Sequence, residues 1–436
     1  MARIRPFRAL RYNTQNPLAI AMVTAPPFDC INAELRDDLY RLHPHNVVRL
    51  ILGRDEPGDN DIHNKYTRAA DLIDKWQNTG ILRRDSEPAL YFYQQEFGAE
   101  GKSYCREGVL ARVGIEEFGT GKVFPHEETM DGPRKDRMKM ICATRTNLSP
   151  VFGVYPDPKN VIPDLFHEVV HCEPLVQTVD ADGVVHRLFS SSDTGLAEHV
   201  AGAMADKAIF IADGHHRYET ALAYRHMLAE KGVEVDHDHP ADSVLMLCVS
   251  MHHPGLAVLP THRVLHGLDG LSTDRLRDVS ARHFEWTEFD GAEATSPRLA
   301  EHLARAPEHS FGLWTRDTSK AFLLTLKDPK VMDEAAADKS QAWRKLDVSI
   351  LQRVFLRRDL PEAVEGADRT IRLTYVHLAQ QAFDAVHEDG ADAAVVLRPL
   401  PVRSLEDVAT TGERMPPKST YFYPKALSGL VFNPLD

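Results

Sequence analysis

Apolar positions along the chain follow two periods, one typical of strands and the other of helices. Short apolar or alternating runs predict strands at 19–25, 47–52, 89–94, 109–115, 150–155, 208–213, 243–251 and 393–398. Apolar residues at helical spacing predict helices at 33–42, 67–79, 136–144, 193–204, 215–231, 273–283, 297–305, 331–342 and 346–356. Because strands and helices alternate through the first third, the pattern predicts an α/β (α+β) protein.

Three regions are predicted from this order of elements. An N-terminal α/β region covers residues 1–150, and a core region built around the strand at 208–213 covers residues 151–265. A C-terminal helical and α/β region covers residues 266–436, where most predicted elements are helices with acidic and alanine-rich faces. At 436 residues the chain is long enough for two or three domains with well-buried cores.

The stretch 208–222 carries the clearest chemical pattern. Its apolar run stops at Asp213-Gly214 and is followed by helical spacing, which predicts a strand, a tight turn and a helix. His215, His216 and Arg217 fall in the first turn of that helix, where the helix dipole opposes positive charge and favours an anion. A bound phosphate would offset the unfavourable positive charge at this helix start, so Asp213 to Arg217 form a candidate phosphate-binding turn.

Two other interpretations of this stretch stay open. An Asp-Gly turn before a polar helix start is common in α/β proteins and needs no ligand. His215 and Glu219 are four residues apart on one helix face and could bind a metal ion, although two ligands do not complete a site.

Four further loops contain candidate site residues. Asp29 follows the rigid pair Pro26-Pro27, and a Gly/Pro loop at 124–137 contains His126 and Glu127. Any of Asp29, His126 or Glu127 could accept a proton from a hydroxyl group, and Glu127 could also help to hold Mg²⁺. The other two loops contain His262 and Arg263, and Lys418, respectively.

His262 is a candidate acid or base, whereas Arg263 and Lys418 are candidate phosphate clamps. Each of these residues also has a structural interpretation. The loop residues could cap neighbouring elements or lie on a solvated face, and the closing segment 412–425 could be a cover strand whose tyrosines pack while its lysines are solvated.

The sequence Gly-His-His-Arg-Tyr-Glu-Thr-Ala at 214–221 resembles the phosphate-binding box of the ParB/sulfiredoxin superfamily. In that superfamily a strand and a Gly-x-x-Arg turn lead into a helix whose start holds nucleotide phosphates. The box is most similar to the version in the family named domain of unknown function 1015 (DUF1015). The same resemblance extends through the segments Arg5 to Leu10, Ala25 to Asp29, Phe124 to Arg137 with Thr129, Leu259 to Arg263, and Met415 to Lys425.

The resemblance implies a ParB/sulfiredoxin-like nucleotide-binding core with an additional C-terminal α/β region. Members of the superfamily use the pocket in different ways: sulfiredoxin activates a sulfinic acid, ParB proteins use CTP as a clamp switch, and others phosphorylate free serine. Sulfiredoxin chemistry needs a cysteine where this chain has His215, so we reject that activity. The resemblance then favours an enzyme, a kinase-like phosphotransferase.

The implied kinase binds a nucleotide or pyrophosphate at Gly214 to Arg217 and phosphorylates a small hydroxylated metabolite such as free serine. Its expected cofactor is Mg²⁺ with ATP, ADP or another phosphate donor. A nucleotide-gated regulatory or binding protein of ParB-like type, without phosphoryl transfer, is the alternative. A metal-dependent hydrolase that uses the histidine-rich loops is a third possibility.

Composition narrows these possibilities. With 43% hydrophobic and 26% charged residues, the chain is typical of a soluble globular protein. Its 51 Lys and Arg against 64 Asp and Glu give a net charge of −13, which disfavours general nucleic-acid binding and a ParB-like DNA surface. No run approaches the ~18 apolar residues of a membrane span, and no signal-like segment follows the start, so we expect a cytoplasmic protein without a membrane partner.

The five cysteines include no Cys-x-x-Cys pair, which argues against a disulfide framework or a structural zinc site. Histidine is more abundant, with 22 residues, and many of them lie in clusters within loops. Such clusters are typical of solvated loops as well as of adventitious metal binding.

Overall fold

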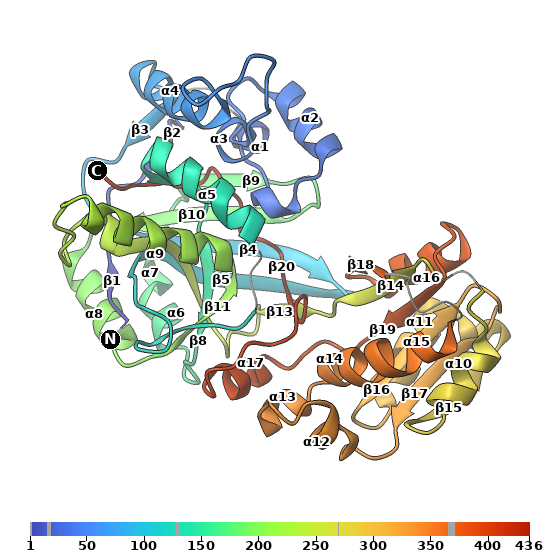
Figure 1. Cartoon of the computed structure of the whole chain (residues 1–436). Coiled ribbons are helices and arrows are strands. Elements are labelled where there is room, and N and C mark those ends of the chain that lie inside the picture. The colour runs from blue at the N-terminus through green and yellow to red at the C-terminus, as the bar shows by residue number, and fades with distance from the viewer. Residues whose placement is uncertain (1, 15–18, 128–130, 269, 365–370) are drawn as a thin grey trace. The chain divides into compact units, whose positions relative to one another are not determined.

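The computed structural model of the chain describes residues 2–14, 19–127, 131–268, 270–364 and 371–436. Thr129 of the loop motif lies outside the described residues. The chain divides into two compact units (Figure 1). Unit 1 comprises Met1–Pro125, Thr129–Ala257 and Pro424–Asp436, and unit 2 comprises His126–Glu128 and Val258–Tyr423. The protein is a mixed α/β protein with several sheets, as the sequence predicted.

The predicted regions do not coincide with these units. The boundary at residue 150 falls inside unit 1, and the long segment of unit 2 begins at Val258, a few residues before the predicted boundary at 265. The division into three regions stays a prediction.

Unit 1 is built on one mixed sheet. Among the described residues it has nine strands in the order β6-β11-β8-β12-β5-β4-β10-β9, with β1 also paired to β5. The strands are β1 (Ile4–Arg5), β4 (Leu90–Ala99), β5 (Lys102–Gly114), β6 (Val123–Pro125), β8 (Val151–Tyr155), β9 (Val176–Val179), β10 (Val185–Ser191), β11 (Ile209–Asp213) and β12 (Ser243–Ser250). β11 runs parallel to β6 and antiparallel to β8, so it is enclosed on both edges.

The core of unit 1 lies on the faces of this sheet. Every residue of β12 is buried, which explains its continuous apolar run. The helices of unit 1 that follow residue 130 are α5 (Asp131–Thr144), α6 (Val161–Leu165), α7 (His167–Val170), α8 (Thr194–Met204) and α9 (His215–Glu230). α9 packs against β8 and β12 and lies beside α5 (Figure 1). Tyr218 and Ala221 of α9 join Ile209 and Ile211 in one buried cluster.

A second cluster of unit 1 surrounds the buried Trp76. It is formed by α1 (Ile20–Val23), α2 (Ala33–Leu42), α3 (Val48–Ile51), α4 (Lys65–Asn78) and the strand pair β2 (Leu10–Tyr12) and β3 (Leu82–Arg84). Asn32 caps α2 as predicted, because its side chain accepts a hydrogen bond from Leu35 N at 2.8 Å. The remaining short pieces of unit 1 are β7 (Thr146–Asn147), which pairs with β21 (Asn433–Pro434), and two 3₁₀ turns at Phe28–Cys30 and Pro240–Asp242.

Two strand predictions in this region are wrong. The runs at 19–25 and 47–52 form the helices α1 and α3. A short apolar run does not distinguish a buried strand from a buried helical turn, and tertiary contacts decide. Here the Asn46 side chain stabilises the helical turns. It accepts a hydrogen bond from Val48 N at 2.9 Å and donates to the carbonyl oxygens of Met22 and Thr24.

Unit 2 contains an antiparallel sheet that the sequence largely missed. Its described strands follow the order β15-β17-β16-β19-β14-β18. They are β14 (His262–His266), β15 (Phe284–Phe289), β16 (Ser310–Thr315), β17 (Ala321–Leu326), β18 (Arg372–Val376) and β19 (Ala393–Val396). Of these, only β19 was predicted. Outside this sheet lie the short strands β13 (Ala257–Leu259) and β20 (Tyr421–Tyr423).

Two predicted helices of unit 2, at 273–283 and 331–342, are shorter in the structure, whereas the helix predicted at 297–305 is confirmed and the one at 346–356 forms part of a longer helical run. The helices of unit 2 are α10 (Thr273–Ser280), α11 (Ser296–Arg305), α12 (Val331–Ala335), α13 (Gln341–Arg344), α14 (Asp347–Ile350), a π-helix at Leu351–Asp359, α15 (Leu360–Ala363), α16 (Ala379–His387) and α17 (Val402–Ala409), with a 3₁₀ turn at Gly291–Ala294. The predicted helix 331–342 is broken because Ser340 caps α13, accepting from Trp343 N at 3.2 Å.

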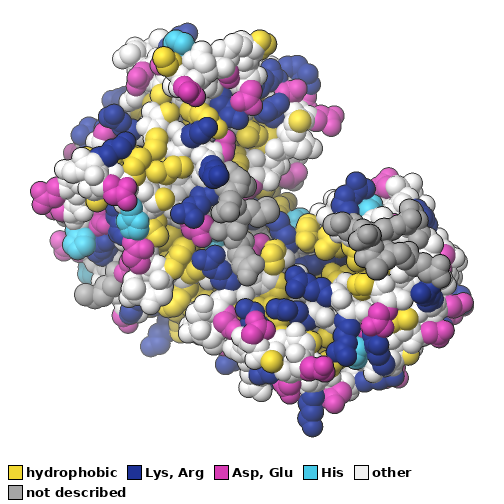
Figure 2. Space-filling model, viewed as in Figure 1, with side chains coloured by type: hydrophobic (Ala, Val, Ile, Leu, Met, Phe, Trp, Pro, Cys, Tyr) yellow, Lys and Arg dark blue, Asp and Glu magenta, His cyan; other side chains and the backbone are white. Residues whose placement is uncertain are grey.

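Acidic and basic side chains are mixed on the surface, as the composition of the chain leads us to expect. On the face in Figure 2, acidic and basic side chains are interspersed over both units. No helix among the described residues combines the length and the apolar character that crossing a membrane requires.

Candidate functional site

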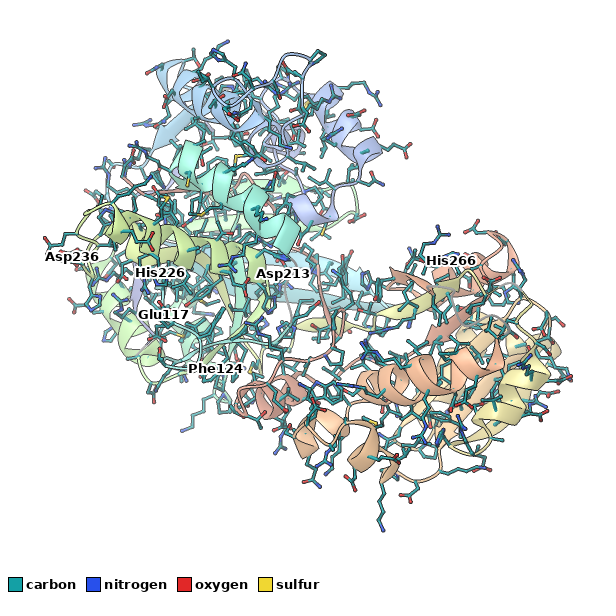
Figure 3. All side chains as sticks on the ribbon, viewed as in Figure 1. Glu117, Phe124, Asp213, His226, Asp236 and His266 are labelled. Atoms are coloured by element: carbon teal, nitrogen blue, oxygen red, sulfur yellow. The ribbon has the colours of Figure 1, made fainter. Side chains whose placement is uncertain are left out.

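The strand, turn and helix predicted around Gly214 are confirmed. β11 ends at Asp213, which Figure 3 labels, and α9 begins at His215. Gly214 adopts φ 85° and ψ 31°, in the left-handed region that favours glycine. A Cβ atom at this position would also lie 2.9 Å from the Arg217 guanidinium carbon. Gly214 is therefore required both for the backbone turn and for the close approach of Arg217.

Arg217 folds back over the turn that precedes it. One terminal nitrogen donates to Asp213 Oδ2 at 2.5 Å, and the other donates to the carbonyl oxygen of Pro150. Its Nε and the hydroxyl of Thr220 are buried and make no hydrogen bond with the described residues. Both residues line a small cavity of about 50 Å³. Arg217 is thus held at the predicted turn, and its Nε–H group is a donor without an acceptor among the described residues.

Lys425 completes this group from the far end of the chain. Its ammonium donates to Asp213 Oδ1, so the carboxylate binds one cation on each oxygen. The main chain that brings Lys425 there is itself held by buried side chains. Gln95 donates to the Lys425 carbonyl at 3.1 Å, and Arg106 donates to the Pro424 carbonyl at 2.5 Å.

Charge at the turn is set by these neighbours. Burial alone would raise the pKa of Asp213, but the Lys425 ammonium and the Arg217 guanidinium hold it well below the usual range of a carboxyl group. Burial opposes the charge of Lys425, yet Asp213 raises the pKa of that ammonium. Burial lowers the pKa of Arg106 to about 10, against the attraction of Asp213. Around Asp213, the basic side chains Arg106, Arg217 and Lys425 outnumber this carboxylate, which all three attract.

Two more predicted residues join this cluster in unit 1. Asp29 lies in the exposed 3₁₀ turn Phe28–Cys30 and is close enough to raise the pKa of Lys425. His215 is buried and contributes to lowering the pKa of Asp213. His216 is half-buried in the first turn of α9. We call Asp29, Arg106, Asp213, His215, Arg217 and Lys425 the Asp213 cluster.

The other predicted residues gather in unit 2. The His126 side chain is buried, with its Nε2 3.0 Å from Thr420 Oγ1. The carbonyl oxygen of His126 accepts from Met415 N at 2.7 Å. Glu127 Oε1 accepts from the backbone N–H of Lys418 at 2.7 Å. Both predicted bases therefore bind the segment that contains Lys418.

Arg263 holds the same segment from its other side. Its buried guanidinium donates to the carbonyl oxygens of Thr261 and, at 2.9 Å, of Lys418. Burial lowers the pKa of Arg263 to about 10, against the attraction of Tyr375 and Glu127. The Lys418 side chain is exposed, and its backbone has φ 58°. Glu127, Arg263 and Lys418 lie together in unit 2, where Glu127 and Arg263 bind main-chain groups of Lys418.

His262 has a structural environment. Its Nδ1 accepts from Leu397 N at 3.2 Å, and burial together with Arg263 lowers its pKa to about 3. This histidine is therefore neutral across the physiological range and packs within unit 2. The predicted roles of His126, Glu127, Arg263 and Lys418 stay predictions.

Among the described residues, His215 and Glu219 are not joined at the turn by enough His, Cys, Asp or Glu side chains to hold a metal ion. His215 and Glu219 are both buried on α9. Across the described ranges of the chain, no three His, Cys, Asp or Glu side chains group in a way that could hold a metal ion.

Lys425 and Arg106 are the residues of the Asp213 cluster that sequence reasoning missed. Lys425 lies in the basic closing segment that the sequence marked, but Lys418 was chosen from that segment instead. The sequence signal for Lys425 is its position directly after Pro424, because proline restricts the backbone next to the Lys425 side chain. Arg106 and Gln95 gave no sequence signal, since charged and polar residues in an alternating strand are expected to face solvent.

Solved structures with distant likeness to this chain were found. They include a free serine kinase in complex with AMP, 14% identical, covering 69% of this chain and 83% of the other at a TM-score of 0.34. A conserved hypothetical protein from Pyrococcus furiosus is 13% identical, covering 69% and 87% at a TM-score of 0.32. C-terminally truncated SbnI from Staphylococcus aureus is 14% identical, covering 73% and 85% at a TM-score of 0.35.

No curated protein matches the chain. The family model described as "Protein of unknown function (DUF1015)" matches residues 4–349, which is most of the chain and includes the Gly214 turn. The chain therefore belongs to the DUF1015 family.

Proposed function

We propose that this protein is a kinase-like phosphotransferase. A nucleotide, or pyrophosphate, binds with its phosphates at the Gly214 to Arg217 turn, and a small hydroxylated metabolite such as free serine accepts the phosphoryl group. We further propose that the sheet and α9 of unit 1 form a ParB/sulfiredoxin-like core, consistent with the resemblance of residues 214–221 to the phosphate box of that superfamily.

One observation carries the proposal. At the start of a helix, Arg217 and Lys425 each bind one oxygen of the Asp213 carboxylate, and the Arg106 charge also attracts that carboxylate. The first turn of an α-helix presents N–H groups that have no partner within the helix, and its dipole favours an anion. Excess positive charge in a half-buried site costs free energy unless an anion arrives. A phosphate group supplies that anion.

Phosphoryl transfer requires positioning and charge neutralisation more than covalent help from the protein. Arg217 and Lys425 would bind the transferred phosphoryl group, with Asp213 fixing both of them. Mg²⁺ supplies further neutralisation when it is bound to the phosphates, and it usually takes only one or two protein carboxylates. Asp213 is the carboxylate of the Asp213 cluster that would hold such an ion.

Asp29 is our choice of base for the acceptor hydroxyl. It is exposed in the same unit as the turn, and its charge reaches Lys425. Glu127, the other predicted carboxylate, accepts a backbone N–H in unit 2. A base must lie within hydrogen-bond reach of the proton that it takes, so an exposed carboxylate within the Asp213 cluster fits the role better.

The test is binding of phosphate compounds to the full chain by calorimetry and thermal shift. ATP, ADP, AMP, CTP and pyrophosphate are each titrated with Mg²⁺ into the wild-type protein, Arg217→Ala and the control Lys231→Ala, which changes an exposed residue at the far end of α9. A ligand at about 100 times its Kd should stabilise the fold by roughly 2.7 kcal/mol. We expect Arg217→Ala to weaken that ligand by about tenfold to a hundredfold, because it removes a charge-assisted contact, and Lys231→Ala to have no effect.

Equal affinity in Arg217→Ala and wild type, or no response to any phosphate compound, would refute the phosphate assignment. A second assay separates kinase from switch. The protein is incubated with the bound nucleotide and free serine or other hydroxylated metabolites, and phosphorylated product is measured by NMR. Steady turnover supports the kinase, whereas tight binding without turnover favours the nucleotide-gated regulatory protein.

A further inference from the structure

A cavity of about 570 Å³ lies entirely within unit 2. It is lined by the chain just before β16, by α13 and α14, and by the start of α17. Its size is within the range of small-molecule sites in proteins. None of the residues that line it belongs to the Asp213 cluster, so its occupant is a separate question from the phosphate site.

One part of the lining offers donors to an anion. The Lys345 side chain is exposed and makes no ion pair with any residue that the structure describes. Pro401 precedes α17, and no side chain caps the N–H groups of that helix within the described chain. Ser404, in the first turn of α17, adds a hydroxyl group to the same wall. An ammonium, a helix start and a hydroxyl together favour a carboxylate or similar anionic group.

Thr261 gives a second, independent observation. Its side chain lines the cavity and is only 2% exposed, and its hydroxyl makes no hydrogen bond with the described residues. An unsatisfied buried hydroxyl is unusual, because it loses its hydrogen bonds to water without replacement. A polar ligand in the cavity would supply the missing partner.

The remaining charges indicate a second polar end. Asp347 is already neutralised, since Arg398 donates to it at 3.0 Å and His309 Nδ1 lies 3.2 Å from it. Glu308 and Asp407 are exposed carboxylates on the cavity wall. The cation paired with Asp407 is Arg403, with the two charged atoms 4.0 Å apart. These carboxylates would attract an ammonium group.

We propose that this cavity binds a small zwitterionic metabolite. Its anionic group lies against Lys345, Ser404 and the start of α17, and its ammonium group faces Asp407 and Glu308. Leu346, Val348, Leu397 and Leu400 form apolar walls for the part of the ligand between or beside its charges. The site goes beyond the proposed kinase activity, and it holds whether or not unit 1 binds a phosphate.

The test uses free amino acids as the simplest zwitterions. Each is titrated into the full chain by calorimetry, and every hit is repeated as its N-acetylated and its amidated derivative. The variants are Lys345→Met, which keeps the aliphatic stem, and Ser404→Ala. The matched control is Lys330→Met, an exposed lysine of unit 2 that does not line the cavity.

We expect at least one amino acid to bind, and Lys345→Met to weaken it about tenfold or more through loss of a charge-assisted contact. Ser404→Ala should weaken it severalfold, and both derivatives should bind more weakly than the parent. No binding by any member of the panel would overturn the proposal, as would unchanged affinity in both variants. Equal binding of the N-acetylated form would overturn the zwitterionic assignment, and loss of binding in Lys330→Met would overturn the location.

Discussion

Replacing Lys425 with methionine tests the charge arrangement at the Asp213 cluster. The substitution keeps most of the aliphatic stem and removes the ammonium that contacts Asp213 Oδ1. Both side chains are mostly buried, at 14% and 15% exposed, so solvent screens their attraction only weakly. Losing one partner of a buried pair costs about 3 to 5 kcal/mol when the other charge is stranded.

Here the cost should be smaller, because Arg217 still binds the second oxygen of Asp213. We expect a loss of about 2 kcal/mol in the free energy of unfolding near neutral pH. Lys231→Met, at an exposed position directly after α9, is the control and should change stability by less than about 0.5 kcal/mol.

The pH dependence gives the prediction its sharpest form. The pKa of Asp213 is lowered in the folded protein, so its contribution to stability is present above the unfolded value near 3.9 and is lost as the pH falls through the folded pKa. The pKa of Lys425 is raised in the folded protein, so its contribution persists until the pH rises through that folded value. The difference between wild type and Lys425→Met should therefore be constant from about pH 5 to pH 9 and shrink in acid.

Urea unfolding followed by circular dichroism at several pH values measures this difference, and hydrogen exchange of peptides from 209–230 assigns it to the turn. A destabilisation that is the same at acid and neutral pH would mean that Lys425 acts by packing. The charge of Asp213 would then not contribute to the stability difference between wild type and Lys425→Met, and our electrostatic account of the cluster would be refuted.

Two other predictions concern the turn and the base. Gly214→Ala must hold φ 85° and place Cβ 2.9 Å from Arg217, whereas Gly232→Ala must hold φ 80° with no atom within 4 Å of its Cβ. Both should lose roughly 1–2 kcal/mol from the backbone, and Gly214→Ala about 1–3 kcal/mol more from the clash, as measured by thermal unfolding. Equal losses would show that Arg217 moves aside freely. If Asp29 is the base, Asp29→Asn should lower kcat about a hundredfold or more with nucleotide affinity unchanged, while Glu127→Gln changes kcat by less than about threefold. The opposite ranking would assign the base to Glu127.

The turn could be predicted because its signals are local. An apolar run, Asp-Gly and a helical pattern specify a strand, a left-handed glycine and a helix start within a few residues. The short runs at 19–25 and 47–52 failed for the opposite reason, since the Asn46 side chain that orders both lies outside them. The β15 sequence Phe-Glu-Trp-Thr-Glu-Phe also escaped notice, because charged residues interrupt its alternation.

Only those residues of the candidate site that lie close together in the sequence could be predicted. His215 and Arg217 could be chosen because they are adjacent to Gly214 in sequence. Lys425 reaches Asp213 across 212 positions, and Arg106 and Gln95 act by holding main-chain carbonyls. Such contacts depend on the completed fold, and no spacing in the sequence encodes them.

Unit 2 interrupts unit 1, and this order bears on how the protein is made. Residues 258–423 must be synthesised before Pro424–Asp436 can return to unit 1. Until then the ribosome-bound chain contains Asp213 but not its partner Lys425. It also lacks β21, which pairs with β7, and the main-chain carbonyl groups that Arg106 and Gln95 bind. The Asp213 cluster is therefore completed last, and a nascent chain arrested before residue 424 should expose an incomplete unit 1 to chaperones and proteases.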